Sequence, residues 1–305
     1  MKKKFELANL SKNLLYCVCF SICALNLTAC DDDDENGTQG NGPAPIGIPS
    51  SVVDGVRATS MSGVDVTYNE DGTIKEAEVD GNTLVFNYAS SRAIKVDPIR
   101  SLISITSSER ESERWIASDF AFNTSGFVTA YKLKYTDTDS REEMNIAYTF
   151  NYNADGQMQK ISMKVDGKDD EGSYSESGEI NYTYNNKVLE KIEAKSKNIT
   201  CSQTYEYTQA IKNTYNAMPL LLLPEALASD DCVFNVFAIT GYLGNAGANL
   251  PTAMTIKNTD LEDPSENSTE RYNLSYTLNE NKAIASYTLS GYGETMTFPC
   301  DWTNF

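Results

Sequence analysis

Apolar and polar residues alternate along most of the chain after residue 52. Between 144 and 152 every second residue is Met, Ile, Tyr or Phe, and similar alternation recurs at 161–165, 180–184 and 272–278. A period of two sends successive side chains to opposite faces of a strand, so each segment has one buried and one solvated face. The pattern predicts about 14 to 16 strands.

Short turn sequences separate the predicted strands. They are Asn69–Gly72, Asn123–Gly126, Asn153–Gly156 and Asn185-Asn186, and the last three lie about 30 residues apart. Gly and Asn tolerate the positive φ of tight hairpins, and Asn or Asp can bond back to the local backbone. A repeated strand–turn–strand unit predicts an up-and-down antiparallel meander, with looser charged connections such as Asp166–Ser177 between hairpins.

One apolar segment, 216–243, breaks the alternation. Within it Glu225–Ala228 and Val233–Tyr242 are predicted short helices, and the segment separates the first dozen strands from the last four. A barrel of about 16 strands leaves a lumen that its own side chains do not fill. We therefore predict one all-β domain over 52–305, an antiparallel meander forming a barrel-like or strongly curved sheet. The insert would plug or cover its apolar face.

An outer-membrane pore is the alternative architecture. The chain ends on Phe305 after Trp302, and a terminal phenylalanine resembles the closing strand of outer-membrane barrels. Segments such as Ala77–Asp80, however, alternate small or apolar residues with acids, which suits a face in water. The sequence also lacks the long loops on one side that such pores carry. We favour the plugged, water-facing body.

The N-terminal residues have the pattern of a cleaved export signal. Lys2, Lys3 and Lys4 precede an apolar run, Leu14 to Leu27, that is shorter than the roughly 20 residues of a spanning helix. The run ends in Leu27-Thr28-Ala29-Cys30, which resembles the lipobox of bacterial lipoproteins. The resemblance implies that 1–29 is a signal peptide and that Cys30 is lipidated. Two acyl chains suffice for stable anchoring.

Residues 30–51 form a predicted tether. Asp31–Glu35 follows the cysteine directly and resembles the surface-export signal of Bacteroidetes lipoproteins, and such a run is also solvated and self-repelling. The rest is rich in Gly, Pro, Ser and Asn and has no core-forming pattern. We expect an outer-membrane, lipid-anchored protein exposed at the cell surface, with the membrane as a partner through the lipid.

The charge and composition narrow the function. The full chain has 25 basic and 43 acidic residues and no histidine, and removal of 1–29 leaves 21 and 42, a charge of −21. Such an acidic surface repels phosphate backbones, so no nucleic-acid partner is expected. The missing histidine excludes Ser-His-Asp and Cys-His catalysis and histidine-ligated metals. We predict no catalytic residue, no cofactor and no metal site.

The remaining cysteines and acids suggest no catalytic group. Cys201, Cys232 and Cys300 stay in the predicted mature chain, and an exported protein can form a disulfide, but the spacing does not choose a pair. Asp71 and Asp155 lie in turn signals, so a hairpin role fits them better than a glycosidase acid pair. The 18 tyrosines mostly share the apolar face, which favours core packing over carbohydrate stacking.

One block within 242–255 is distinctive. Leu243-Gly244, Asn249-Leu250-Pro251 and Thr255 resemble the LG-x-x-x-x-NLP-x-x-x-T block of a Bacteroidetes lipoprotein family of unknown function, described as having a porin-like fold. The resemblance implies a large, mostly antiparallel, barrel-like body on a lipoprotein. It implies no activity and supplies no functional residues.

Three functions stay open at this point. The preferred hypothesis is a non-catalytic surface lipoprotein that binds a ligand, such as a glycan or another nutrient, or is an accessory to an outer-membrane complex. An enzyme would be a carboxylate-dependent glycoside hydrolase, which needs two facing acids in an aromatic-lined cleft. The third hypothesis is a structural envelope protein without a small ligand.

Overall fold

The protein is described here by a computed structural model covering residues 49–79, 82–88, 101–106, 113–137, 142–169, 172–197, 199–218 and 232–304. The predicted signal peptide, Cys30, most of the tether, the predicted helix Glu225–Ala228 and Phe305 lie outside these residues. The domain boundaries predicted at residues 30 and 52 therefore stay predictions.

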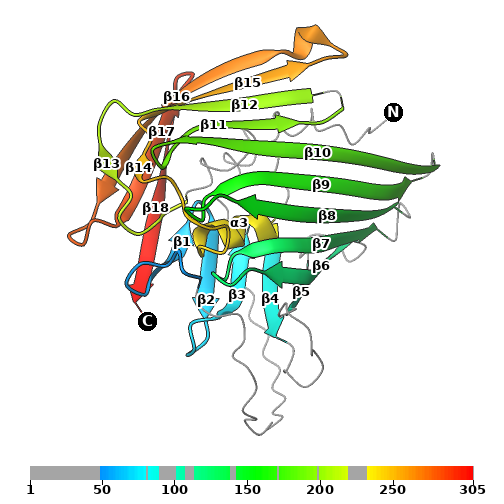
Figure 1. Ribbon diagram of the computed structural model, residues 1–305, viewed down its shortest axis with the longest axis horizontal. Coiled ribbons are helices and arrows are strands. Elements are labelled where there is room, and N and C mark those ends of the chain that lie inside the picture. The colour runs from blue at the N-terminus through cyan, green and yellow to red at the C-terminus, as the bar shows by residue number, and fades with distance from the viewer. Residues whose placement is uncertain are drawn as a thin grey trace, which may run out of the picture.

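Sixteen strands form one antiparallel sheet in chain order, and it closes into a barrel because β1 pairs with both β18 and β2 (Figure 1). The strands of this barrel are β1 Val56–Met61, β2 Val64–Tyr68, β3 Ile74–Val79, β4 Asn82–Tyr88, β5 Ser101–Thr106, β6 Glu113–Phe122, β7 Val128–Asp137, β8 Glu142–Tyr152, β9 Met158–Asp169, β10 Gly172–Asn185, β11 Val188–Lys195, β12 Ile199–Glu206, β15 Ala253–Asp260, β16 Ser268–Leu278, β17 Ile284–Gly291 and β18 Glu294–Asn304. β13 (Ile211–Lys212) and β14 (Asn249–Leu250) form a separate pair. The prediction of an all-β antiparallel meander is confirmed.

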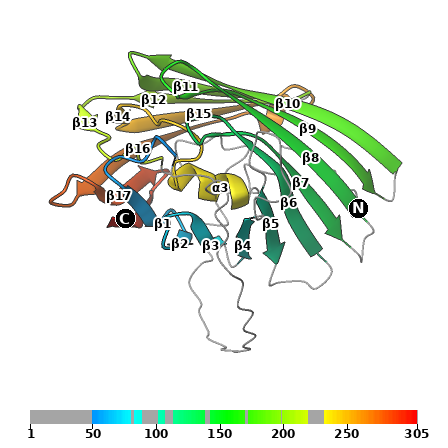
Figure 2. The same cartoon turned by 60° about the horizontal axis from the view of Figure 1, so that its bottom comes forward.

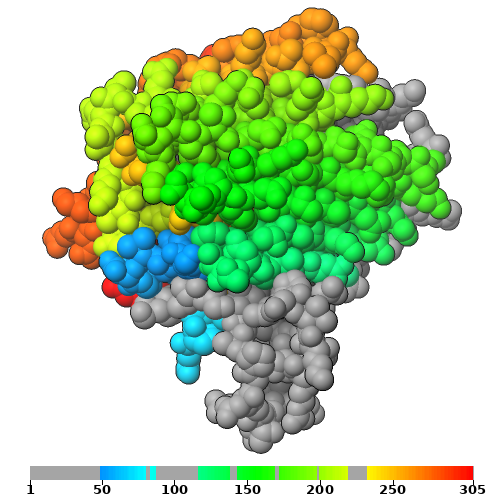
Figure 3. All heavy atoms as spheres, viewed as in Figure 1, coloured from blue at the N-terminus to red at the C-terminus, as the bar shows by residue number. Residues whose placement is uncertain are grey.

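The apolar face of the sheet points inward and the polar face points outward. In β10 the buried Ile180 lies between the exposed Glu179 and Asn181, and in β16 the buried Tyr272 is followed by the exposed Asn273. Strands β7 to β12 make a continuous outer wall in the space-filling view (Figure 3). Among the described side chains, the exposed large apolar ones are Val53, Val85, Leu261 and Tyr292.

The repeated turns share one hydrogen-bonding geometry. Asn153 donates its backbone N–H to the carbonyl of Gln157 at 2.9 Å, and its own carbonyl accepts from Gly156 N–H at 3.0 Å. The same two bonds recur at the turns that begin at Asn69, Asn123 and Asn279. The fourth position has a positive φ in every case, 77° at Gly72, 80° at Gly126, 73° at Gly156 and 68° at Lys282. The predicted turns over 69–72, 123–126 and 153–156 are confirmed.

Aromatic side chains near these turns tie neighbouring strands together. Each donates a hydrogen bond to a backbone carbonyl near the start of the preceding barrel strand. The pairs are Tyr68 to Ala58 at 2.7 Å, Tyr152 to Val128 at 2.6 Å, Tyr207 to Leu189 at 2.6 Å, Tyr276 to Pro251 at 2.9 Å and Trp302 to Ile284 at 2.7 Å. A buried phenol needs such a partner, so the strand-end aromatic is part of the repeated unit.

The loose connection predicted over Asp166–Ser177 is wrong. β9 continues to Asp169 and β10 begins at Gly172, and Asp166 pairs directly with Ser175. Backbone ladder bonds need no apolar face, so the two strands outlast the apolar alternation that marked them in the sequence. Hydrogen bonds from Lys164 and Ser175 hold the pKa of the Asp166 carboxyl below its usual value.

Among its described residues, the apolar insert contains one helix, α3 (Cys232–Ile239), which lies on the inner side of the sheet (Figures 1 and 2). Its residues from Val233 to Ile239 are all buried, as expected of a helix that is apolar all round. The Phe237 ring lies 5.6 Å from Phe120 and 6.3 Å from Phe86, centroid to centroid. In the part of the chain that the structure describes, no helix is long and apolar enough to cross a membrane.

Candidate functional site

The two ends of the barrel differ, because the end of the insert and the residues that follow it, 242–248, bond to the turns of one of them. We call this the capped end; it carries the turns 69–73, 123–127 and 153–157. Asn245 donates its backbone N–H to the Gly156 carbonyl at 2.8 Å and its side-chain N–H to the Asp155 carbonyl at 2.6 Å. The opposite end, with the hairpins at 62–63 and 292–293, is the far end.

The distinctive block within 242–255 has a structural role at the capped end. Val128 N–H donates to the Tyr242 carbonyl and Ala248 N–H to the Lys187 carbonyl, both at 2.9 Å. A β-carbon on Gly244, where φ is +90°, would lie 2.4 Å from the Gly156 carbonyl oxygen, closer than any real contact. Glycine is therefore required where the insert meets the turn.

The two acids considered as a catalytic pair are turn residues. Asp71 Oδ1 accepts from the backbone N–H of Thr73 at 2.9 Å and from its hydroxyl at 2.7 Å. These bonds lower the pKa of Asp71. Asp155 lies in the next-but-one turn and pairs with Lys187 at 2.7 Å. The hairpin interpretation of both residues agrees with this geometry.

The cysteines form no disulfide with one another in the described residues. Cys201, Cys232 and Cys300 lie on β12, α3 and β18, and Cys201 and Cys300 are buried. Burial raises the pKa of the Cys300 thiol to about 12, with a further contribution from the nearby Asp301 carboxylate. The thiol therefore stays protonated at neutral pH and is a poor nucleophile.

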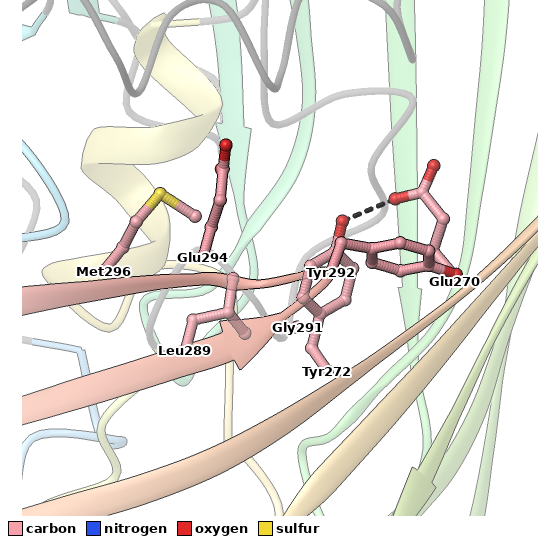
Figure 4. A pocket seen from close by; sticks show the side chains of 7 residues that line it. All are labelled: Glu270, Tyr272, Leu289, Gly291, Tyr292, Glu294 and Met296. Atoms are coloured by element: carbon pink, nitrogen blue, oxygen red, sulfur yellow. Dashed lines mark hydrogen bonds between the residues drawn. The ribbon is translucent and has the colours of Figure 1, made fainter.

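The candidate site is a pocket of about 230 Å³ at the far end of the barrel (Figure 4). It lies between β16, β17 and β18, and its lining residues are Glu270, Tyr272, Leu289, Gly291, Tyr292, Glu294 and Met296. The alternation of β16 places Glu270 and Tyr272 in the same inward register as the buried Leu274. The pocket is therefore hollowed from the inner face of the sheet.

Two tyrosines and a carboxylate form the centre of this pocket. The Tyr272 and Tyr292 rings lie 6.0 Å apart, centroid to centroid, at an angle of 58°. The Tyr272 hydroxyl donates to Glu270 Oε2, and the Tyr292 hydroxyl donates to the Thr269 carbonyl at 2.7 Å. Tyr292 is 68% exposed although its hydroxyl is held in place. The Tyr292 ring is thus positioned without being buried, and it lies beside the buried Tyr272.

Charge differs between the two faces of the same strands. Arg271 points outward from β16 and forms a two-bond ion pair with Glu206 of β12. The pair raises the pKa of Arg271 and lowers that of Glu206. The described residues that line the pocket include Glu270 and Glu294 and no basic residue. The positive charge is therefore on the outside and the carboxylates are inside.

Sequence reasoning missed this pocket, although it carries a signal. The alternation that marks Tyr272, Leu274 and Tyr276 as inward residues extends back to Glu270. On β18 the same register runs from Glu294 through Met296. An acid in the inward register of an amphipathic strand is unusual and could have singled out both residues.

The pocket offers binding and carboxylate chemistry. No group of three or more His, Cys, Asp or Glu side chains in the described ranges is arranged to hold a metal ion. What the pocket does present is two carboxylates, two aromatic rings, a thioether and an aliphatic side chain. That set suits a small ligand held by charge, stacking and apolar contact.

These features define a large antiparallel β-barrel with an internal helix and an inner pocket. The chain belongs to the family described as a domain of unknown function (DUF4595) with porin-like fold, which matches residues 68–286. The family predicted from the 242–255 block is thereby confirmed.

Solved structures and curated proteins complete the comparison. A porin-like protein from Bacteroides vulgatus is similar over 83% of this chain and 98% of its own, with a TM-score of 0.51 and 11% identity. A porin-like protein from Bacteroides uniformis covers 82% of this chain and 94% of its own, with 17% identity and a TM-score of 0.43. No curated protein matches. The first likeness supports the fold and carries no function.

Proposed function

We propose that this protein is a lipid-anchored, non-catalytic ligand-binding protein of the outer membrane, exposed at the cell surface. The observation that carries the proposal is the inner pocket, where Tyr272 and Tyr292 lie beside Glu270. Aromatic rings and a few placed polar groups are typical of small-molecule sites. Its ligand would be a nutrient such as a sugar or another small metabolite.

The outward face of the barrel supports a body that stands in water. A barrel in lipid carries an apolar band on its outer face and polar residues inside. Here Glu179, Asn181 and Thr183 are exposed along β10, and Ile180 is buried within. This orientation is the reverse of a lipid-facing barrel. It supports anchoring through Cys30 in preference to insertion of the strands.

The hydrogen bonds of Ser50 and Ser51 show at which end of the barrel the chain enters it. Ser50 N–H donates to the Ser125 carbonyl at 2.9 Å, and the Ser51 hydroxyl donates to the Gly241 carbonyl at 2.6 Å. Both acceptors belong to the capped end. The last residues of the predicted tether, Ser50 and Ser51, therefore lie at the end opposite the pocket, and the pocket would be directed away from the membrane.

A blocked-pocket variant tests ligand binding. The full mature chain in mild detergent would be screened by thermal shift against neutral sugars, carboxylates and amines. Met296→Trp should fill the pocket and abolish any shift, whereas Thr295→Trp, on the outer face of the same strand, should retain it. A ligand that stabilises both variants equally would show that binding occurs elsewhere.

The anchor has its own test. Cys30→Ser should release the exported protein from the membrane fraction, because a single thioether-linked cysteine carries the acyl chains. Replacement of Asp31–Glu35 by Asn and Gln should retain anchoring and reduce labelling of intact cells. If the Cys30→Ser variant stays in the membrane fraction and dissolves only in detergent, strands inserted in lipid would be favoured instead.

A second candidate function is glycoside hydrolysis, because Glu270 and Glu294 line the same pocket. Such enzymes use one carboxyl as acid and the other as base or nucleophile. Glu270→Gln and Glu294→Gln would each abolish hydrolysis of a reporter glycoside while sugar binding persists. Absence of turnover by the unmodified chain on every glycoside that it binds would exclude this candidate.

A further inference from the structure

We infer that the pocket selects a small organic cation, namely a ligand with an ammonium group, over a neutral one of the same shape. The inference rests on the proposed ligand-binding function and names the chemical class of the ligand. It follows from the way Tyr272, Tyr292, Glu270 and Glu294 are arranged around one cavity.

The hydroxyl groups of both tyrosines are engaged, and the exposed Tyr292 presents its ring face. The Tyr272 hydroxyl is engaged by Glu270 and that of Tyr292 by the Thr269 carbonyl. Neither hydroxyl proton remains for a sugar oxygen, whereas the ring of Tyr292 is 68% exposed and its negative face is accessible, with the buried Tyr272 packed beside it. Cations bind over such faces, with about 0.5 to 2 kcal/mol per contact depending on desolvation.

The two carboxylates of the pocket also favour a cationic ligand. Figure 4 shows Glu270 and Glu294 projecting to the same side of the sheet, from β16 and from the start of β18. Each carries a negative charge that attracts an ammonium group, and the described lining contains no basic residue that would neutralise them. The nearest basic neighbour in sequence, Arg271, points outward and is paired with Glu206.

The size of the pocket limits the ligand. Its volume of about 230 Å³ is below the roughly 300 Å³ at which pockets enclose drug-sized molecules. A quaternary ammonium compound, a small amine or one amino sugar fits this space, and an extended polysaccharide does not. Leu289 and Met296 supply apolar contact for the methyl or methylene groups that surround such a nitrogen.

The test compares choline with its neutral tert-butyl analogue, in which carbon replaces the charged nitrogen. Calorimetry on the full mature chain in mild detergent at low salt should give choline binding, and the neutral analogue should bind at least about tenfold more weakly. Glu294→Gln removes one negative charge from the pocket and should weaken choline by about tenfold. Asp301→Asn, which removes a charge from the outer face of the same strand, should not.

The outcomes separate this inference from the proposed function. Equal binding of choline and the neutral analogue, or an unchanged affinity in Glu294→Gln, overturns cation selection. If Met296→Trp still abolishes binding of a neutral metabolite in that case, the pocket remains the ligand site. Failure of choline, tetramethylammonium and ethanolamine to bind also overturns cation selection. If choline still binds to the Met296→Trp variant, its binding site lies outside this pocket and the inference is overturned.

Discussion

The two ends of the barrel belong to the same strands but differ in their turns and in their chemistry. At the capped end, turns and insert are joined by neutral backbone hydrogen bonds, such as Asn245 N–H to the Gly156 carbonyl. At the far end, β16 to β18 enclose a pocket with two carboxylates and a 68% exposed tyrosine. Turn residues at the capped end bond to neighbouring backbone groups, although the buried Tyr242 hydroxyl has no hydrogen-bond partner among the described residues. The far end presents its carboxylates.

This difference shows where stability and binding are placed in the fold. The aromatic cluster around Phe237 and the tyrosine-to-carbonyl bonds lie in or near the capped end. Exposing these apolar and hydrogen-bonded groups to water lowers the free energy of unfolding. Glu270 and Glu294 contribute no apolar burial and place two negative charges together. We therefore expect substitutions at the capped end to unfold the protein and those at the far end to change binding.

Alkaline pH should have the largest effect, because it ionises tyrosines that are buried along the barrel, among them Tyr287, which bonds to Ser62 at the far end. Burial raises the pKa of Tyr242 to about 12 and raises those of Tyr68, Tyr152, Tyr184 and Tyr276 further. A raised folded-state pKa means that stability is complete below the unfolded value near 10 and is lost as the pH rises through the folded values. Each such tyrosine subtracts about 1.4 kcal/mol per pH unit.

The measurement is denaturant unfolding at a series of pH values, with phenolate absorbance recorded in parallel. The midpoint should stay level up to about pH 10 and then fall steeply, with phenolate appearing together with unfolding. Tyr152→Phe should lower stability at neutral pH by losing its bond to Val128 and make the alkaline slope shallower. Phenolate formation well before unfolding would show that these rings are not buried.

Phe237→Ala should be the most destabilising single substitution at the capped half. Phe237 lies within 6.4 Å, between ring centroids, of Phe120, Phe122 and Tyr242, so its removal leaves a cavity among these rings. Loss of a buried phenylalanine costs about 3 to 5 kcal/mol. Met296→Ala, in the half-buried pocket, should cost about 1 kcal/mol or less. Equal losses in chemical denaturation would contradict the assignment of stability to the capped end.

Gly244→Ala should destabilise the protein by about 2 to 4 kcal/mol. The added carbon would meet the Gly156 carbonyl at 2.4 Å, and φ is +90°. Gly293→Ala is the matched control, because its φ is +83° and its β-carbon would contact nothing within 4 Å. The control isolates backbone strain, about 1 to 2 kcal/mol, and the difference between the variants measures the close approach. A difference near zero would mean that the insert can retreat from the turn.

The capped end was largely predictable from the sequence, and the far end was not. The turns at Asn69, Asn123 and Asn153 and the helix near 233 have local signals, because turn chemistry and apolar runs act over a few residues. The helix ends at Ile239 and not at Tyr242 as predicted. The apolar alternation ends before β9 and β10 do, so the pattern did not predict that these strands continue to Asp169 and from Gly172. The pocket joins Glu270 to Glu294 across strands, and no single-sequence pattern reports that pairing.

The smallest expected effect is a gain in stability at the turn that begins at Asn279. Lys282 has φ +68° in the position that glycine occupies at Gly72, Gly126 and Gly156. Lys282→Gly removes a left-handed strain of about 1 to 2 kcal/mol and adds about 0.5 to 1 kcal/mol of unfolded-state entropy, so we expect a gain of roughly 0.5 to 1 kcal/mol. Lys282→Ala removes the same charge but keeps the β-carbon, and should give no such gain in thermal unfolding. If both variants gain equally, the charge and not the backbone is responsible, and the equivalence of the four turns fails.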